Sequence, residues 1–130
     1  MIVLDASAIV ELVVEPRAAT GAIRSRLRAD PDVHVPHLVD AEVTNALRRK
    51  LLAGQLDLVR ARRAIRRLTA IRLVRWQQSS LLGRALALRD QLSAYDAIYV
   101  AMAEATGATL VTRDTRLARA TGHRAHIEVL

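Results

Sequence analysis

Residues 1–10 read MIVLDASAIV, and this stretch decides how the rest of the chain is interpreted. A short apolar run over residues 1–4 meets a carboxylate at Asp5, and small residues then lead into an apolar, helix-compatible segment. The pattern predicts a buried strand that feeds a helix, with Asp5 at the carboxyl end of the strand. In open parallel sheets, ligands bind at that edge. A carboxylate so close to a core is costly without a partner, and a metal ion is one such partner.

The length and composition predict one folded domain over residues 1–130. Cysteine is absent, which excludes disulfides and thiolate chemistry and fits a cytoplasmic location. No apolar run reaches the roughly 18 residues of a membrane span, and the N-terminus does not resemble a signal peptide, so we expect no membrane association. The 20 basic residues exceed the 13 acidic ones, and the resulting net charge of +7 favours a polyanionic partner.

Strand-like and helix-like segments alternate along the chain. Strands are expected at residues 1–4, 33–36, 73–76, 108–112 and 127–129. Helices are expected after Asp5, at residues 15–30, 38–54, 56–71, 81–92 and 93–106, and from Asp114 onward. Such alternation implies βα units. The fold class expected is therefore α/β, a single domain whose five-stranded parallel sheet is flanked by helices on both faces.

Helical spacing also predicts which faces are buried in two of these helices. In the helix at residues 38–54, the residues expected inward are Leu38, Ala41, Asn45 or Ala46, Leu47 and Leu51. In the helix at residues 56–71, they are Leu58, Ala61, Ile65 and Leu68, with Arg60, Arg63 and Arg67 outward.

Three further carboxylates, Glu42, Asp96 and Asp114, fall near helix starts, where each has an ordinary structural explanation. Acids in a first helical turn are favoured by the helix dipole. Ser93 and Asp96 resemble a capping box, and Asp114 has the residue type of an N-cap. Asp5 is different, because we expect no helix cap to account for a carboxylate at the end of an apolar strand.

The four acids together support a metal site more strongly than any one of them. Parallel strands would bring Asp5 and Asp114 to one edge of the sheet, and helices at that edge can add Asp96 and Glu42. Clustered carboxylates repel one another and cannot all stay ionised without cations. Oxygen ligands select Mg²⁺ or Mn²⁺. On a basic protein, such a site predicts metal-assisted hydrolysis of phosphodiester bonds.

Four segments carry a resemblance to a known family: MIVLDASAIVELV (1–13), AEVTNALRR (41–49), SAYDAIYVAMAE (93–104) and TLVTRDTRL (109–117). In this order and spacing, the chain resembles a PIN-domain protein, specifically a VapC-type ribonuclease toxin of a type II toxin–antitoxin system. The resemblance implies a five-stranded parallel α/β sheet, Mg²⁺- or Mn²⁺-dependent endonucleolytic cleavage of RNA, a homodimer, and neutralisation by a cognate antitoxin. The acidic quartet of that family falls on Asp5, Glu42, Asp96 and Asp114 without substitution.

Roles follow for these acids and for three supporting residues. We expect Asp5 and Asp96 to bind a metal directly, and Glu42 and Asp114 to bind a second ion or hold its water. Ser7 either hydrogen-bonds a ligand carboxylate or the phosphate, or caps a helix. Asn45 is expected to orient Glu42 from the same helical face, and Thr112 to orient Asp114. Ser7, Asn45 and Thr112 are thus the supporting residues of the predicted site.

Weaker signals leave alternatives open. The arginines at residues 60–67 form a basic face that either tracks RNA or is simply a solvated surface. The histidines lack the partners at ligand spacing that a zinc site needs. The apolar stripe of the first two helices, residues Ile9, Val13, Ile23 and Leu27, is expected to be mostly core, although the family resemblance implies that part of it forms an antitoxin groove.

Three other function classes are compared with the nuclease. A receiver domain would need an acidic pair after the first strand and a late lysine, whereas Asp5 precedes Ala-Ser and Lys50 lies mid-helix. A P-loop enzyme is excluded, because no Gly-Lys-Ser/Thr occurs. A non-catalytic RNA-binding module on the same fold is the alternative that remains.

Overall fold

A five-stranded sheet organises the protein, whose computed structural model describes residues 1–14 and 21–130. The strands are β1 (Ile2–Leu4), β2 (Val33–Pro36), β3 (Val74–Trp76), β4 (Thr109–Thr112) and β5 (Ile127–Val129). All neighbouring strands pair in parallel, in the order β3-β2-β1-β4-β5. The predicted α/β class and the five parallel strands are therefore confirmed. The central strand β1 is apolar and fully buried, as a strand covered on both faces must be.

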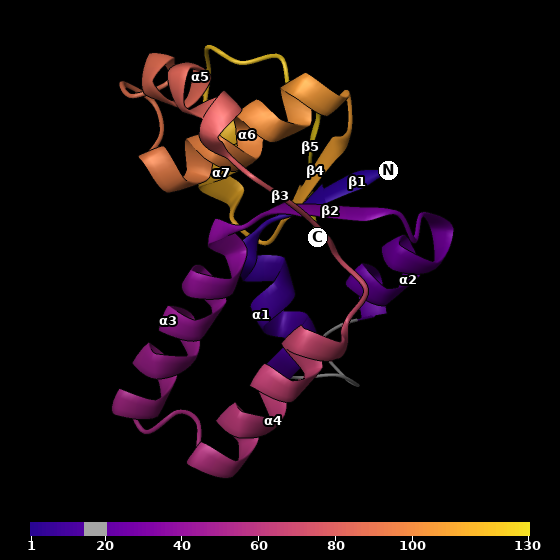
Figure 1. The fold of residues 1–130 in the computed structure, drawn as a ribbon, viewed down its shortest axis with the longest axis vertical. Coiled ribbons are helices and arrows are strands. Elements are labelled where there is room, and N and C mark those ends of the chain that lie inside the picture. Colours follow the sequence, from indigo (N-terminus) through magenta and orange to yellow (C-terminus); the bar gives the residue numbers. More distant parts are fainter. Residues whose placement is uncertain (15–20) are drawn as a thin grey trace.

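Helices cover both faces of this sheet. They are α1 (Ala6–Val14), α2 (Gly21–Ala29), α3 (Leu38–Leu52), α4 (Leu58–Ala70), α5 (Leu82–Ala87), α6 (Ala94–Thr106) and α7 (Thr115–Arg119), with a 3₁₀ turn at Ser79–Leu81. In Figure 1, α5 and α6 lie above the sheet, while α1, α3 and α4 lie below it. The first two crossovers run from β1 to β2 and on to β3, and the third returns to place β4 on the other side of β1. The direction of winding thus reverses between β1 and β4, which in such sheets opens a crevice at the carboxyl ends of these strands.

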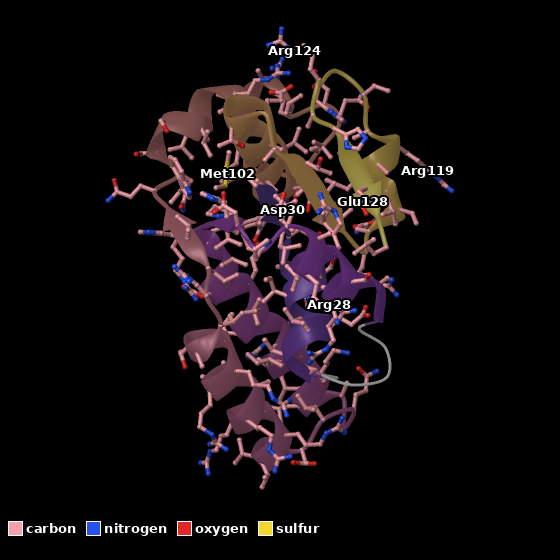
Figure 2. All side chains as sticks on the ribbon, turned by 90° about the vertical axis from the view of Figure 1, so that its right-hand side faces the viewer. Arg28, Asp30, Met102, Arg119, Arg124 and Glu128 are labelled. Carbon is pink, nitrogen blue, oxygen red and sulfur yellow. The ribbon has the colours of Figure 1, made fainter. Side chains whose placement is uncertain are left out.

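The core is built from aliphatic side chains, because phenylalanine is absent from the chain. Ile2 and Leu4 of β1, Ile9 of α1 and Leu110 of β4 are completely buried. Among the described residues, the largest fully buried side chain is Tyr99 of α6, which belongs to the same core cluster as Met102 of that helix. In Figure 2, Met102 lies within the molecule, whereas Arg28, Arg119 and Arg124 extend from its surface. Within the described residues, no helix is long and apolar enough to cross a membrane.

Two predictions about helix faces are wrong in part. In α3 the buried residues are Val39, Val43 and Leu47, and Ala41 is exposed. The sequence offers two alternative apolar faces for this helix. The face with the larger valines buries more surface than the face with Ala41 would. In α4, Ala61 and Leu68 are buried as predicted, but Leu58 is 53% exposed because it is the first residue of the helix and lies at the far end from the sheet.

Arg67 is not simply an outward charge. Its guanidinium crosses from α4 to α1 and donates a hydrogen bond of 2.8 Å to the carbonyl oxygen of Val13. The last carbonyls of a helix have no partner inside the helix, so Arg67 satisfies one of them at the end of α1. Arg60 and Arg63 are exposed, as predicted.

One predicted helix is interrupted in the structure, and the predicted start of another lies outside the described residues. The segment expected as one helix at residues 81–92 is a 3₁₀ turn at Ser79–Leu81, a short α5 and then turns through residue 92. Gly83 weakens this segment, and its helix ends where the chain must bend back toward α6. The predicted start of the second helix at Glu15 and Pro16 lies outside the described residues, and α2 continues to Ala29.

Candidate active site

A pocket of about 360 Å³ lies at the crevice between β1 and β4. The four acids predicted from the sequence all line it: Asp5, Glu42, Asp96 and Asp114. They come from four different places, the end of β1, the second turn of α3, the first turn of α6 and the turn after β4. The pocket also contains Ser7, Tyr99 and two basic residues of α3, Arg49 and Lys50.

Asp5 is the most buried of the four acids, with 7% of its surface exposed. Its Oδ1 accepts a hydrogen bond of 3.0 Å from the backbone nitrogen of Ala8, and its carbonyl oxygen accepts one from Ile9. These are the contacts of an N-cap residue. The expectation that no helix cap accounts for Asp5 is therefore wrong, because α1 begins at the very next residue.

Two hydroxyl groups also hold the Asp5 carboxylate. Thr112 Oγ1 donates to Asp5 Oδ2 at 2.6 Å, and Ser7 Oγ lies 2.7 and 2.9 Å from the two carboxylate oxygens. Of the alternatives for Ser7, the structure shows the carboxylate contact and not a helix cap, since Ser7 lies inside α1. Thr112 contacts Asp5 rather than the Asp114 carboxylate, and it accepts a hydrogen bond of 2.9 Å from the Asp114 backbone nitrogen.

The electrostatics of Asp5 are dominated by burial. Loss of solvent raises the pKa of Asp5 above its usual value, and the negative charge of Asp96 raises it further. Hydrogen bonds from Thr112, Ala8 and Ser7 lower the pKa of Asp5, but they offset only part of this rise. Asp5 is thus a carboxylate that would gain from a nearby positive charge.

Glu42 is held by a residue that the sequence reasoning missed. The hydroxyl of Tyr99, which is 2% exposed, donates a hydrogen bond of 2.6 Å to Glu42 Oε2. Burial raises the pKa of Glu42, the Tyr99 hydrogen bond lowers it, and the charges of Asp96 and Asp5 raise it. Tyr99 lies three residues after Asp96, so the helical spacing of α6 could have placed it on the same face. Asn45, the predicted partner of Glu42, is exposed and makes no hydrogen bond to it.

Asp96 and Asp114 both take part in helix capping. Ser93 is the N-cap of α6 and accepts a hydrogen bond from the Asp96 backbone nitrogen, while its hydroxyl donates to Asp96 Oδ2 at 2.8 Å. Asp114 is the N-cap of α7, and its carboxylate pairs with Arg116 at 2.7 Å. The hydrogen bond and the charge of Arg116 lower the pKa of Asp114.

The chemistry of the pocket suits a hard cation, because its acidic donors are all carboxylate oxygens. However, in residues 1–14 and 21–130 no three His, Asp or Glu side chains lie close enough to hold a metal ion as they stand. Glu42 is turned to Tyr99 and Asp114 to Arg116. The four carboxylates therefore share one pocket, and they would have to rotate to gather around a single ion.

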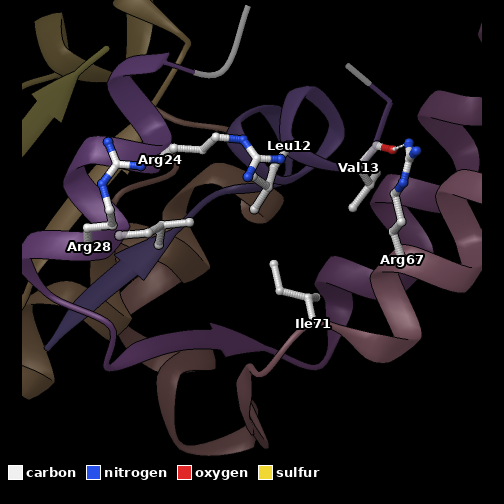
Figure 3. A pocket seen from close by; sticks show the side chains of 7 residues that line it. Leu12, Val13, Arg24, Arg28, Arg67 and Ile71 are labelled. Carbon is white, nitrogen blue, oxygen red and sulfur yellow. Dashed lines mark hydrogen bonds between the residues drawn. The ribbon is translucent and has the colours of Figure 1, made fainter. Parts of the chain in front are cut away.

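A second, apolar groove lies on the α1 side of the sheet (Figure 3). It measures about 470 Å³ and has Leu12, Val13, Leu27 and Ile71 as apolar lining, with Arg24, Arg28 and Arg67 beside them. Ile9, Val13 and Ile23 of the predicted stripe are core residues, and Val13 and the half-buried Leu27 also line this groove.

Comparison with known proteins places the chain in a family. The model of the PIN domain matches residues 2–122. Ribonuclease VapC3 of Mycobacterium tuberculosis is 42% identical over 119 residues, which cover 92% of this chain and 86% of that protein. The chain belongs to the VapC-type toxins of the PIN-domain family. The predicted family is therefore confirmed, and it is within this VapC-type fold that the four acids line one pocket.

Solved structures agree with this VapC-type fold. PAE2754 from Pyrobaculum aerophilum has a TM-score of 0.69 at 26% identity, covering 94% of this chain and 87% of its own. VapBC2 from Rickettsia felis, solved bound to a DNA fragment from its promoter, has a TM-score of 0.68 at 16% identity and covers 100% of this chain and 99% of its own. The second likeness concerns the fold alone.

Proposed function

We propose that this VapC-type protein is an endoribonuclease that hydrolyses RNA phosphodiester bonds with Mg²⁺ or Mn²⁺. The observation that carries the proposal is the meeting of Asp5, Glu42, Asp96 and Asp114 in one pocket at the crevice of the sheet. A ribonuclease that is 42% identical over nearly the whole chain supports the choice of RNA as substrate. The excess of basic residues is consistent with a polyanionic substrate.

In this proposal, Asp5 and Asp96 bind the cation directly, and Glu42 and Asp114 bind a second ion or hold its water. When bound, the cation supplies positive charge that stabilises the charge developing on the phosphate. It would also offset the burial and the mutual repulsion that raise the pKa values of Asp5 and Glu42.

The remaining residues orient these carboxylates. Ser7 and Thr112 fix the plane of the Asp5 carboxylate from two sides. Tyr99 holds Glu42 Oε2, which leaves Glu42 Oε1 without a hydrogen bond from the described residues and available to accept one from a water in the pocket. Donors that hold the Asp5 carboxylate in this way support catalysis, because its orientation needs little change during the reaction.

We further propose an antitoxin partner that binds the groove in Figure 3. A solved toxin–antitoxin complex from Klebsiella pneumoniae shares the fold, and the groove combines apolar lining with arginines that suit an amphipathic segment bearing acidic residues. The family resemblance also leads us to propose a homodimer in the cytoplasm.

Cleavage with purified protein tests the nuclease proposal. Wild-type protein should shorten RNA when Mg²⁺ or Mn²⁺ is added and stop when EDTA is added. Asp5→Asn and Asp96→Asn should each abolish cleavage, and Asp90→Asn, which removes an exposed acid outside the pocket, should not. Folding is checked by circular dichroism. If both pocket variants cut RNA as fast as the wild type, the site is wrong; if the wild type retains RNA without shortening it under either cation, the non-catalytic RNA-binding module is the better description.

Co-expression tests the partner. The product of the gene beside this one should co-purify with the protein and suppress cleavage. Leu27→Asp should weaken that complex without reducing nuclease activity, because Leu27 lines the groove and not the acidic pocket. A complex that tolerates this change would place the antitoxin elsewhere.

A further inference from the structure

Two cations stand on the wall of the acidic pocket. Arg49 and Lys50 belong to α3, and both line the pocket that contains the four carboxylates. Arg49 follows Glu42 by seven residues, two turns of the helix and about 10 Å along its axis. Lys50 is the sole lysine of the chain. The helix that supplies one acid thus also supplies positive charge farther along the same pocket.

In their contacts, these cations differ from Arg113 and Arg116, two arginines next to the pocket residue Asp114. Arg113 is paired with Glu11 at 2.7 Å, and Arg116 with Asp114. In the part of the chain that the structure describes, neither Arg49 nor Lys50 forms an ion pair, although carboxylates line the same pocket. The charge of Arg49 still reaches Glu42, since it lowers the pKa of that carboxyl, but burial outweighs this effect. Their charge is therefore available to an anion.

An anionic substrate needs such charge in this place. RNA must bring several phosphates to a pocket lined by four carboxylates, and repulsion opposes the approach. A cation held by the acids would serve the phosphate that is cleaved, but not its neighbours along the strand. Lys and Arg beside the pocket can bind those neighbours and release their counterions.

We propose that Arg49 and Lys50 form a subsite for an RNA backbone phosphate adjacent to the one that is cleaved. The inference rests on the proposed nuclease function and adds the direction from which the strand enters, over the carboxyl-terminal half of α3. Arginine binds phosphate through its planar guanidinium and lysine as a point charge, so the subsite contacts the backbone and not the bases.

The basic face on α4, the other candidate for RNA binding, has no such connection to the acidic pocket. Arg62 and Arg66 line a separate, largely apolar groove between α3 and α4, together with Arg48. Arg48 precedes Arg49 in the same helix, is also exposed, and lies on the wall of that other groove. It therefore provides a control that changes the same charge on the same turn of the helix.

Binding is measured in an Asp5→Asn background, so that the RNA stays intact. A fluorescently labelled single-stranded RNA is titrated with Arg49→Gln/Lys50→Gln and with Arg48→Gln/Arg62→Gln, two variants with equal loss of charge. We expect the first to weaken binding by at least about tenfold near 100 mM salt, and to lower the slope of log K against log salt by about 0.7, which corresponds to one phosphate contact on a single strand. The second should weaken binding by less than about threefold. Urea unfolding checks that both pairs are folded.

Cleavage by the same substitutions in the otherwise wild-type chain gives a second readout. The Arg49→Gln/Lys50→Gln variant should raise KM and leave kcat close to the wild-type value, because the subsite acts on substrate binding. Equal losses of affinity in the two pairs, or no loss in either, would overturn the subsite. A change in the pH profile of cleavage without a loss of RNA affinity would also overturn it, since the cations would then serve only the carboxylates. If the wild type binds RNA through this pair but cleaves nothing, the nuclease proposal fails and the subsite stands.

Discussion

At the scale of single residues, Tyr99 shows how the site depends on groups that carry no charge. Its ring is part of the core, while its hydroxyl reaches Glu42 in the pocket. Burial and the contact with Glu42 raise the pKa of Tyr99 far above its usual value, so the hydroxyl stays protonated and always donates. Tyr99 is thus a positioning residue for Glu42.

Tyr99→Phe should lower cleavage by about 10- to 100-fold, the usual effect of removing a partner of a metal-site carboxylate. The ring still fills the core, so the fold should persist. Tyr95→Phe, in the same helix but 64% exposed, is the matched control and should leave the rate unchanged. The measurement is the initial rate of RNA cleavage over a range of Mg²⁺ concentrations. A Tyr99→Phe variant as active as the wild type at every concentration would show that Glu42 needs no such support.

At the scale of elements, the end of α6 determines how β4 enters the sheet. The helix carries Asp96 and Tyr99, and its C-cap is Gly107 with φ of 68°. Two residues later β4 begins, and it leads to Thr112 and Asp114. The left-handed conformation at Gly107 therefore connects two elements that both supply the pocket.

Gly107→Ala should destabilise the protein by about 1 kcal/mol, because a side chain disfavours positive φ. No heavy atom lies within 4 Å of the added Cβ, so the cost is conformational and not steric. Gly83→Ala is the matched control: it lies within α5, also has open space around its Cβ, and should stabilise the helix by about 0.5 kcal/mol. Urea unfolding monitored by circular dichroism measures both. A destabilised Gly83→Ala or a neutral Gly107→Ala would contradict this account.

At the scale of the whole molecule, the site acids affect stability in opposite directions. The pKa of Asp5 is raised in the folded state, so folding favours its protonated form and stability falls as pH rises from about the ordinary value of 3.8 through the folded pKa. The pKa of Asp114 is lowered, so its contribution is present above 3.8 and is lost as pH falls through the folded pKa.

Thermal unfolding from pH 3 to pH 7 should therefore separate two matched variants. Asp5→Asn should become more stable than the wild type as pH rises. Asp114→Asn should become less stable than the wild type as pH rises. The difference should be no more than about 1 kcal/mol, because its partner Arg116 is on the surface. Mg²⁺ at 100 times its Kd should stabilise the wild type by about 2.7 kcal/mol and Asp5→Asn by less. A wild type that is indifferent to Mg²⁺ would count against the metal site, and equal pH profiles would count against the electrostatic account of Asp5.

Much of the architecture was predictable from the chain alone, because its signals are local. Short apolar runs, helical spacing and turn residues predict the parallel α/β fold. The order of the acids along these elements predicts that Asp5, Glu42, Asp96 and Asp114 share one edge of the sheet. The exact faces of α3 and α4 were less predictable, since a helix with apolar residues on several sides does not specify which side packs.

The contacts within the site required the folded molecule. Thr112 reaches Asp5 across 107 positions of sequence, and Tyr99 reaches Glu42 across 57. Such contacts depend on the strand order and on how α3 and α6 approach the same crevice, which no local pattern specifies. The chain thus specifies which acids are brought to the pocket through its repeating βα pattern, and packing between distant elements specifies which hydroxyl group holds each carboxylate.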